Sequence, residues 1–474
     1  MTLVICVPVA PPEQSRSTLS QQLAALANGA ASAEGLARTF LRGYEHARDL
    51  NAFITVCAAE SLVADACGYD RRRRQGRPVG PLAGLLICVK DNIHITGFPN
   101  TAGTPALRHF RPTADAEVFA ALRARGVICV GKTNMHELAF GVTSANAAFG
   151  AVRNPLAPAK FAGGSSGGTA AAIAAGLVPA GLGTDTGGSI RIPAALCGIA
   201  GFRPASGRYA QGGVTPISRT RDTIGLMACT VEDIALLDAV IMRRDRSKPR
   251  QSTESLRLGV CRYFFEVIDR EIEPVVAASL RRLEKAGIEI VDVDIPGIAS
   301  LMAQSALPIA MYEVSRELRS YLAKYDTGID LSILLREVAS SDVKALLQSA
   351  ISDPEHATDA NYSVALASRE QLKKHYRHAF MTQGLTAMVM PTTPLPARDI
   401  APALDTVDLN GSRVQTFATY IRNAEPATIV GLPSLTVPAG MTPSGLPVGL
   451  LFDGIDDEEL LAAGATIQGL LARA

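Results

Sequence analysis

Two serines flanked by glycines lie close together in this chain, and they constrain its backbone more than any other feature. The stretch from 162 to 204 reads AGGSSGGTAAAIAAGLVPAGLGTDTGGSIRIPAALCGIAGFRP, which places Ser165 and Ser189 on two tight turns. Glycine adopts positive φ without penalty and leaves its N–H unobstructed, so such a turn can surround a reacting carbonyl oxygen. We therefore expect a nucleophile at Ser189. The amides expected to bind the oxyanion are those of Thr186, Gly187, Gly188 and Ser189.

Helix capping is an alternative interpretation of both turns. Ser189 would cap the apolar run IRIPAALCGIAG, and Ser165 or Ser166 would cap GGTAAAIAAG. Capping, however, does not explain why a pair of glycines precedes the serine in each turn.

A serine hydrolase of the α/β-hydrolase type is a second alternative, because GGSSG also matches the G-x-S-x-G nucleophile elbow. Ser165 would then be the nucleophile. The elbow needs a strand directly before it, and NPLAPAKFA contains two prolines and no strand signal. The downstream histidines, His356, His375 and His378, lie in a polar loop and on a basic helix face, where we expect them to be solvated. The context therefore disfavours the elbow.

A candidate base lies upstream in PLAGLLICVKDNI. Lys90 ends the apolar run LLICV, which is typical of a buried strand. Burial disfavours the ammonium form, so the amine of Lys90 would accept a proton near neutral pH. The alternatives are a lysine directed to solvent and an ion pair with Asp91.

The combination of Lys90, Ser165 and Ser189 with GGSSGG and GTDTGGSIRIPAA resembles the amidase signature family. Supporting segments span most of the chain and include LNAFITV, GKTNMHELAFG, GFRPASGR, VMPTTP and GLPSLTVPAGMTPSGLPVGLLF. The resemblance implies a Ser–cis-Ser–Lys triad. Ser189 would be the nucleophile, Ser165 the bridging serine after a cis peptide bond, and Lys90 the base of an acyl-enzyme mechanism.

The resemblance also implies an α/β fold with a central mixed β-sheet covered by helices on both faces. We expect one domain over 1–474, with the core motifs at 80–230 and a helical region at 300–383 that forms part of the substrate pocket. The order of segments agrees with this class, since strands such as LLICVK and VICVGK alternate with helices such as DAEVFAALRARG. SLRLGVCR, REIEPVVAASLRRLEKAG and IEIVDVDI predict a later strand–helix–strand unit. Beside the nucleophile, Asp185 and Arg191 are expected to form a structural ion pair.

Three further segments, at 100–118, 134–155 and 207–225, are most similar to the indoleacetamide and mandelamide hydrolase branch of the family. This similarity implies a small-molecule substrate, a primary amide of an arylacetic acid. Four aromatic residues could form an apolar pocket for the ring: Phe140, Phe149, Phe417 and Tyr420. The alternative is that they belong to the hydrophobic core. Anilides, carbamates and lactams stay open as substrates. Two other functions also stay open: the chain could be the amidase-like subunit of a tRNA-dependent amidotransferase, or a non-catalytic binding protein.

Charge and cysteine content limit the partners. The 46 Lys and Arg residues balance 45 Asp and Glu residues, so we expect neither nucleic acid nor a membrane as a partner. The basic run Arg71–Arg74 is expected to end a surface helix. Eight cysteines show no metal-binding spacing, and the N-terminal MTLVICVPVAPPE lacks a basic leader. We therefore expect a cytoplasmic enzyme without metal or cofactor, and leave a homodimer open.

Overall fold

The computed structural model of the chain describes residues 17–244, 250–353, 358–401 and 405–472. Its centre is an eleven-stranded sheet with strand order β1-β3-β2-β8-β10-β9-β16-β17-β13-β11-β12. The strands are β1 (Phe53–Val56), β2 (Leu86–Lys90), β3 (Ile128–Thr133), β8 (Ala180–Asp185), β9 (Ala200–Arg203), β10 (Thr223–Ala228), β11 (Arg257–Val260), β12 (Glu289–Asp292), β13 (Ala387–Pro391), β16 (Ser434–Met441) and β17 (Pro447–Asp453).

The sheet is mixed. β2 pairs in parallel with β3 and β8, and β11 pairs in parallel with β12 and β13. The strands between these two groups, from β8 through β10, β9, β16 and β17 to β13, pair antiparallel. All residues of β2 and β8 are buried, because their apolar runs lie in the interior of the sheet.

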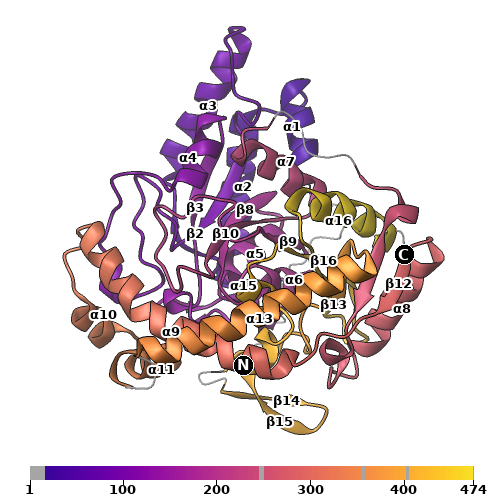
Figure 1. Cartoon of the computed structure of the whole chain (residues 1–474). Coiled ribbons are helices and arrows are strands. Elements are labelled where there is room, and N and C mark those ends of the chain that lie inside the picture. The colour runs from indigo at the N-terminus through magenta and orange to yellow at the C-terminus, as the bar shows by residue number, and fades with distance from the viewer. Residues whose placement is uncertain (1–16, 245–249, 354–357, 402–404, 473–474) are drawn as a thin grey trace, which may run out of the picture.

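Helices cover both faces of the sheet (Figure 1). Successive residues of β16 show the two faces, since side chains alternate along a strand. Leu435 packs against Gly464 of α16 (Asp457–Leu471), whereas Ser434 accepts a hydrogen bond from Arg191 of α6 (Arg191–Cys197). α5 (Gly167–Ala174) packs beside α6, and α7 (Val231–Ile241) and α8 (Glu273–Lys285) pack beside α16. The expected α/β class, with a mixed sheet between helical layers, is confirmed.

The N-terminal helices are α1 (Leu19–Ala27), α2 (Ala33–His46), α3 (Ala59–Arg74) and α4 (Glu117–Ala124). As expected, the arginine run ends α3. The region 300–383 forms α9 (Ile298–Lys324), α10 (Leu331–Glu337), α11 (Ser341–Ser352) and α13 (Asp359–Gln383), followed by α14 (Thr416–Ile421) and α15 (Glu425–Val430). α9 and α13 run side by side across the molecule (Figure 1), and the rings of Tyr312 and Tyr362 stack between them. No described helix has the length and apolarity that a membrane span requires.

Three two-stranded ribbons lie outside the sheet: β4 (Ala145–Asn146) with β5 (Gly150–Ala151), β6 (Arg153–Asn154) with β7 (Ala157–Phe161), and β14 (Thr406–Leu409) with β15 (Ser412–Gln415). The expectation that NPLAPAKFA holds no strand is wrong, because this segment contains β7. A two-stranded ribbon consists of edge strands only, so Pro158 costs no central ladder hydrogen bond. The later strand–helix–strand prediction is confirmed by β11, α8 and β12.

Candidate active site

Lys90 ends β2 in an environment without solvent. Its Nζ donates hydrogen bonds to Ser165 Oγ at 2.7 Å and to Thr184 Oγ1 at 2.8 Å. Burial lowers the pKa of Lys90 to about 7, although the carboxylates of Asp185 and Asp222 favour the charged form. Near neutral pH, Lys90 is therefore a neutral amine in a large fraction of the molecules, and that amine contacts a serine hydroxyl.

The alternative ion pair between Lys90 and Asp91 is absent from the described residues. The carboxylate of Asp91 is held instead by Lys132, with 3.3 Å between Nζ and Oδ1, and by Thr101. Lys132 is fully buried on β3, next to β2. Sequence reasoning missed this pair, although a lysine inside the apolar segment VICVGK was a signal that a second buried cation needs a partner.

The turn that carries Ser165 is joined to the turn that carries Ser189. The peptide bond between Gly164 and Ser165 is cis, the geometry that the family resemblance implied. The carbonyl oxygen of Ser165 accepts hydrogen bonds from the His136 amide at 3.1 Å and from Ser144 Oγ at 3.3 Å. The amide of Ser166 donates to the carbonyl oxygen of Ser189 at 3.1 Å. This backbone bond holds the two serine turns against each other.

Neither serine turn is built as a simple helix cap. α6 begins at Arg191 with Ile190 as its N-cap, so Ser189 precedes the cap. Ser166 is the N-cap of α5, but its hydroxyl makes no capping bond and donates to the carbonyl of Thr184 at 3.2 Å. The side chains of these turns are thus directed to other partners or, for Ser189, to the cavity described below.

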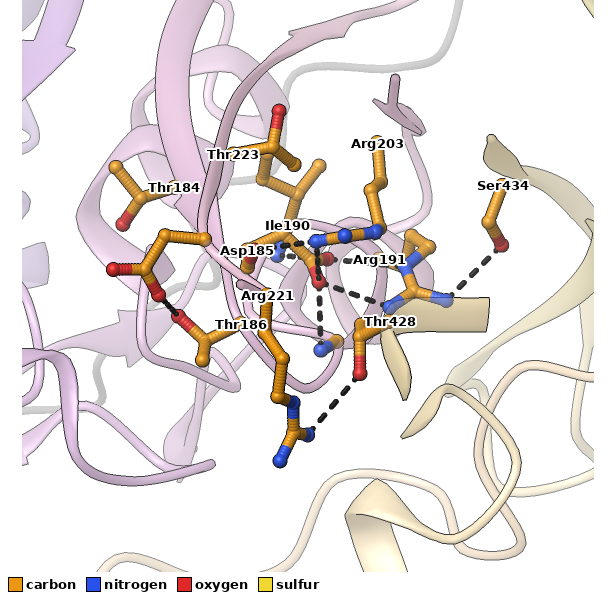
Figure 2. Close-up of polar contacts among 12 residues, drawn as sticks. Thr184, Asp185, Thr186, Ile190, Arg191, Arg203, Arg221, Thr223, Thr428 and Ser434 are labelled. Atoms are coloured by element: carbon orange, nitrogen blue, oxygen red, sulfur yellow. Dashed lines mark hydrogen bonds and ion pairs between the residues drawn. The ribbon is translucent and has the colours of Figure 1, made fainter. Parts of the chain in front are cut away.

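Asp185, at the end of β8, holds the Ser189 turn through its carboxylate (Figure 2). Its carboxylate forms a bidentate ion pair with Arg191, whose Nε donates to Oδ2 at 3.0 Å and whose Nη2 donates to Oδ1 at 2.9 Å. This is the expected structural ion pair. Arg203 donates to the backbone oxygen of Asp185 at 2.6 Å. Burial alone would raise the pKa of Asp185, but the two guanidinium groups outweigh it and lower the pKa to about 2. The carboxylate is therefore charged at any pH at which the protein works.

One of the four expected oxyanion donors is already used. The amide of Gly188 donates to Asp185 Oδ1 at 2.9 Å, so it shapes the turn and does not point to a substrate. The amides of Thr186, Gly187 and Ser189 make no hydrogen bond to another described residue, and all three residues line a cavity. The prediction for Gly188 is corrected, because the buried carboxylate beneath the turn takes its N–H.

Asp222 is a further residue of the site that sequence reasoning missed. Thr186 Oγ1 donates to Asp222 Oδ1 at 2.5 Å, and the amides of Ile217 and Ser218 donate to Oδ2 at 2.8 and 3.0 Å. Burial raises the pKa of Asp222 to about 6, despite these hydrogen bonds. Asp222 thereby anchors Thr186, the first residue of the Ser189 turn, to the 217–222 loop. No local motif marked it.

Ser189 faces a cavity of about 620 Å³. One face of α9 forms an apolar wall, with residues at helical spacing: Ala299, Met302, Ala303, Ala306, Leu307, Ala310 and Met311. Leu346 and Ser349 of α11 complete that side, whereas α13 packs behind α9 and contributes no lining residue. The helical region at 300–383 therefore borders the cavity through α9 and α11.

Of the four aromatic residues expected in the pocket, Phe140 and Phe417 line the cavity and the other two do not. Tyr420 is fully buried in the core, where its hydroxyl donates to the carbonyl of Pro396 at 2.6 Å and its ring packs on Phe161. Phe149 lies in the β4–β5 ribbon region, near the guanidinium of Arg108. The prediction for Phe149 and Tyr420 is corrected, because tertiary packing directs both rings away from the cavity.

The histidines required by the elbow alternative do not approach Ser165. His375 and His378 lie on α13, outside the cavity lining, and His356 lies outside the described residues. Within the described parts of the chain, no cluster of three or more His, Cys, Asp or Glu side chains is arranged to hold a metal ion. Geometry at Ser165 thus links it to Lys90 and to no histidine side chain.

Comparison with known proteins gives a family match over most of the chain. Residues 36–461 match the family described as Amidase. An indoleacetamide hydrolase of Agrobacterium vitis is 39% identical over 460 residues, which cover 95% of this chain and 96% of the relative. A mandelamide hydrolase of Pseudomonas putida is 39% identical over 444 residues, covering 90% of this chain and 85% of the relative.

Solved structures show the same architecture. A crystal structure of an amidase superposes with a TM-score of 0.84 at 30% identity, covering 96% of this chain and all 100% of that one. The native peptide amidase from Stenotrophomonas maltophilia has a TM-score of 0.84 at 26% identity, with 98% of each chain covered.

Proposed function

Because this chain belongs to the amidase family and is an amide hydrolase, we propose that it cleaves a small arylacetic primary amide to a carboxylate and ammonia. The reaction runs through an acyl-enzyme on Ser189. The observation that carries this mechanism is the 2.7 Å hydrogen bond between Lys90 Nζ and Ser165 Oγ, two fully buried side chains. It couples a base whose pKa lies near 7 to the serine turn that is bonded to the Ser189 turn.

The proton relay starts at Lys90. Its neutral amine takes a proton from Ser165 Oγ, and Ser165 takes the proton of Ser189. The Ser189 oxygen attacks the amide carbon, while the amides of Thr186, Gly187 and Ser189 bind the oxyanion. The proton then returns along the same path to the leaving nitrogen, and ammonia departs. Water, activated by the same relay, attacks the acyl-enzyme; the proton returns to the Ser189 oxygen as the carboxylate leaves.

The substrate class is supported by the cavity and by the relatives. A volume of about 620 Å³ lies within the range of small-molecule sites, which is about 300–1,000 Å³. Its wall of alanines and methionines, with Phe140 and Phe417, offers apolar surface for an aromatic ring beside the Ser189 turn. Relatives at 36–39% identity are named indoleacetamide hydrolase or mandelamide hydrolase, and both names describe a primary amide one carbon away from a ring system.

The location proposed for the enzyme is the cytoplasm. None of the seven cysteines in the described residues takes part in a disulfide, and four of them are buried. Thiols of this kind persist in a reducing compartment.

A substrate panel tests the proposal. The purified chain is assayed with indoleacetamide, phenylacetamide, mandelamide and acetamide, together with a nitroanilide and an aryl carbamate. We expect the arylacetamides to exceed acetamide in kcat/KM by about tenfold or more, because the ring is buried in the cavity. A chelator should leave the rates unchanged. Faster turnover of the anilide or the carbamate would contradict the arylacetamide assignment, and no turnover of any amide would contradict the relay itself.

A further inference from the structure

The cavity contains two hydrogen-bond donors for which the protein supplies no anionic partner. Arg422 and Tyr263 both line the cavity that Ser189 lines. The guanidinium of Arg422 donates to Asn423 Oδ1 at 3.0 Å and at 3.4 Å to the carbonyl of Phe264, and it forms no ion pair with a described carboxylate. The Tyr263 hydroxyl makes no hydrogen bond within the described parts of the chain. Donor capacity in this wall therefore exceeds what the protein uses.

The position of Arg422 next to the reacting centre follows from its neighbours. Ile421 and Ala424 pack directly on the oxyanion turn: a methyl group at Gly187 would lie 2.5 Å from Ile421 Cδ1, and one at Gly188 would lie 2.6 Å from Ala424 Cβ. Arg422 stands between these two contacts, at the end of α14. Arg422 and Ser189 thus line the same cavity, and the backbone on both sides of Arg422 is packed on the Ser189 turn.

The charges of the lining do not cancel. Arg221 is neutralised by Glu425, with 3.0 Å between Nη2 and Oε1, and it also bonds Thr428 (Figure 2). Arg422 then leaves the lining with one excess positive charge. Burial lowers the pKa of Arg422, while Tyr263 and the exposed Glu266 favour its charged form. A half-buried guanidinium without a carboxylate is unfavourable in an apolar wall, unless a ligand supplies the acceptor.

We propose that Arg422 and Tyr263 form a subsite for a hydrogen-bond acceptor on the acyl part of the substrate, with a carboxylate bound best. This subsite rests on the proposed function, because it selects among arylacetic amides. A guanidinium only donates hydrogen bonds, so the pair recognises acceptors and not donors. The group must belong to the acyl part, since the leaving group of a primary amide is ammonia and has no room for a second function. A carboxylate also matches the planar fork of arginine.

The test compares ligands that differ only in the acceptor. These are phenylacetamide without one, mandelamide with a hydroxyl, and the monoamides of 1,3- and 1,4-phenylenediacetic acid with a carboxylate. Binding is measured by calorimetry on Ser189→Ala, so that the readout does not depend on turnover. We expect the better-placed carboxylate ligand to bind about tenfold or more tightly than phenylacetamide, through a charge-assisted hydrogen bond.

Two variants in the same Ser189→Ala background assign this preference. Arg422→Met should abolish the carboxylate preference, and Tyr263→Phe, which removes only the hydroxyl, should reduce it several-fold. Arg262→Met is the matched control. Arg262 is exposed and lies outside the cavity lining, and its substitution removes the same charge from a neighbouring position. The control should retain the full preference. Arg422→Lys keeps the charge, loses the planar fork and should give an intermediate preference if Arg422→Met fails to fold.

The inference is overturned if the carboxylate ligands bind no better than phenylacetamide. It is equally overturned if Arg422→Met keeps the carboxylate preference. If Arg422→Met does not fold, the inference is overturned when Arg422→Lys and Tyr263→Phe both keep the full preference. Turnover of phenylacetamide by the unmodified enzyme is measured separately. If the unmodified enzyme does not turn over phenylacetamide, the proposed function is contradicted. The binding measurements then still test whether Arg422 and Tyr263 form the subsite.

Discussion

Lys90 acquires its chemistry from the place where β2 ends. A lysine on an exposed strand end stays protonated, but this one is fully buried and has two hydroxyl partners, Ser165 and Thr184. Burial favours the neutral amine, and the nearby carboxylates limit how far the pKa falls. The local environment, and not the residue type, turns a cation into a candidate base.

The pH dependence of the reaction should report this environment. Below its pKa Lys90 is protonated and cannot accept a proton, so kcat/KM should rise with pH through about 7 and then level off. Lys90→Arg should be as inactive as Lys90→Ala, because a guanidinium stays protonated. Pre-steady-state and steady-state rates from pH 5 to 9 measure both effects. Substantial activity of the arginine variant would exclude the relay.

The two serines should differ in what their loss leaves behind. Ser189→Ala should abolish acyl transfer, because the other hydroxyl of the Thr186–Ser189 turn, that of Thr186, is engaged with Asp222 Oδ1. Ser165→Ala should retain a small residual rate, since the free amides of the turn survive and water replaces the bridge. Turnover and thermal melts of both variants are compared, with the melts as the control for folding. An active Ser189→Ala beside a dead Ser165→Ala would restore the nucleophile-elbow alternative.

At the scale of elements, α9 sets the shape of the cavity. Its alanines and methionines recur at helical spacing, so one face of a single helix forms a smooth wall opposite the Ser189 turn. α13 supports this helix from behind, and α11 closes its end. Small side chains on the wall leave the volume that a ring system needs.

Filling this wall should therefore change selectivity by size. Ala303→Leu adds three carbon atoms to the cavity side of α9, and leucine is nearly as favourable as alanine in a helix. We expect kcat/KM for indoleacetamide to fall about tenfold relative to that for acetamide, through the loss of ring-sized space. Ala323→Leu, on an exposed position of the same helix, is the matched control. An equal loss for both substrates would mean that the wall does not bound the acyl site.

At the scale of the whole molecule, one sheet joins the N-terminal and C-terminal halves of the chain. Alternate residues of β13 supply two apolar clusters: Ala387 and Val389 pack into one, and Met388 and Met390 into the other. Ser434 and Asp453, on the last two strands, extend the network of Asp185 and Arg191 across the sheet. These shared strands support the proposal of a single domain.

The chain should accordingly unfold as one unit. We expect loss of amidase activity and loss of helical circular dichroism to coincide in a single thermal transition, because the apolar cluster of α9, α10 and α11 also contains Leu107, Met135 and Leu138 from the N-terminal half of the chain. Limited proteolysis should release no folded fragment that corresponds to the helical region at 300–383. Two transitions, or a stable helical fragment, would show that this region is a domain of its own.

Sequence patterns by themselves determined the α/β class, the order of its strands and helices, the family and the two serine turns. These depend on local composition: apolar runs of strand length, helical spacing and glycines that permit unusual backbone angles. Lys90, Ser165 and Ser189 were singled out in this way, and their catalytic roles stay predictions.

Only the tertiary structure decided how partners are distributed around those turns. Asp91 binds Lys132 and not Lys90, and Asp222 anchors Thr186. Tyr420 faces the core while Phe417, three residues earlier, faces the cavity. Each of these outcomes is set by which distant strand or loop arrives beside a side chain. Burial and hydrogen bonding between segments far apart in the chain leave no periodic signal in the sequence around either partner.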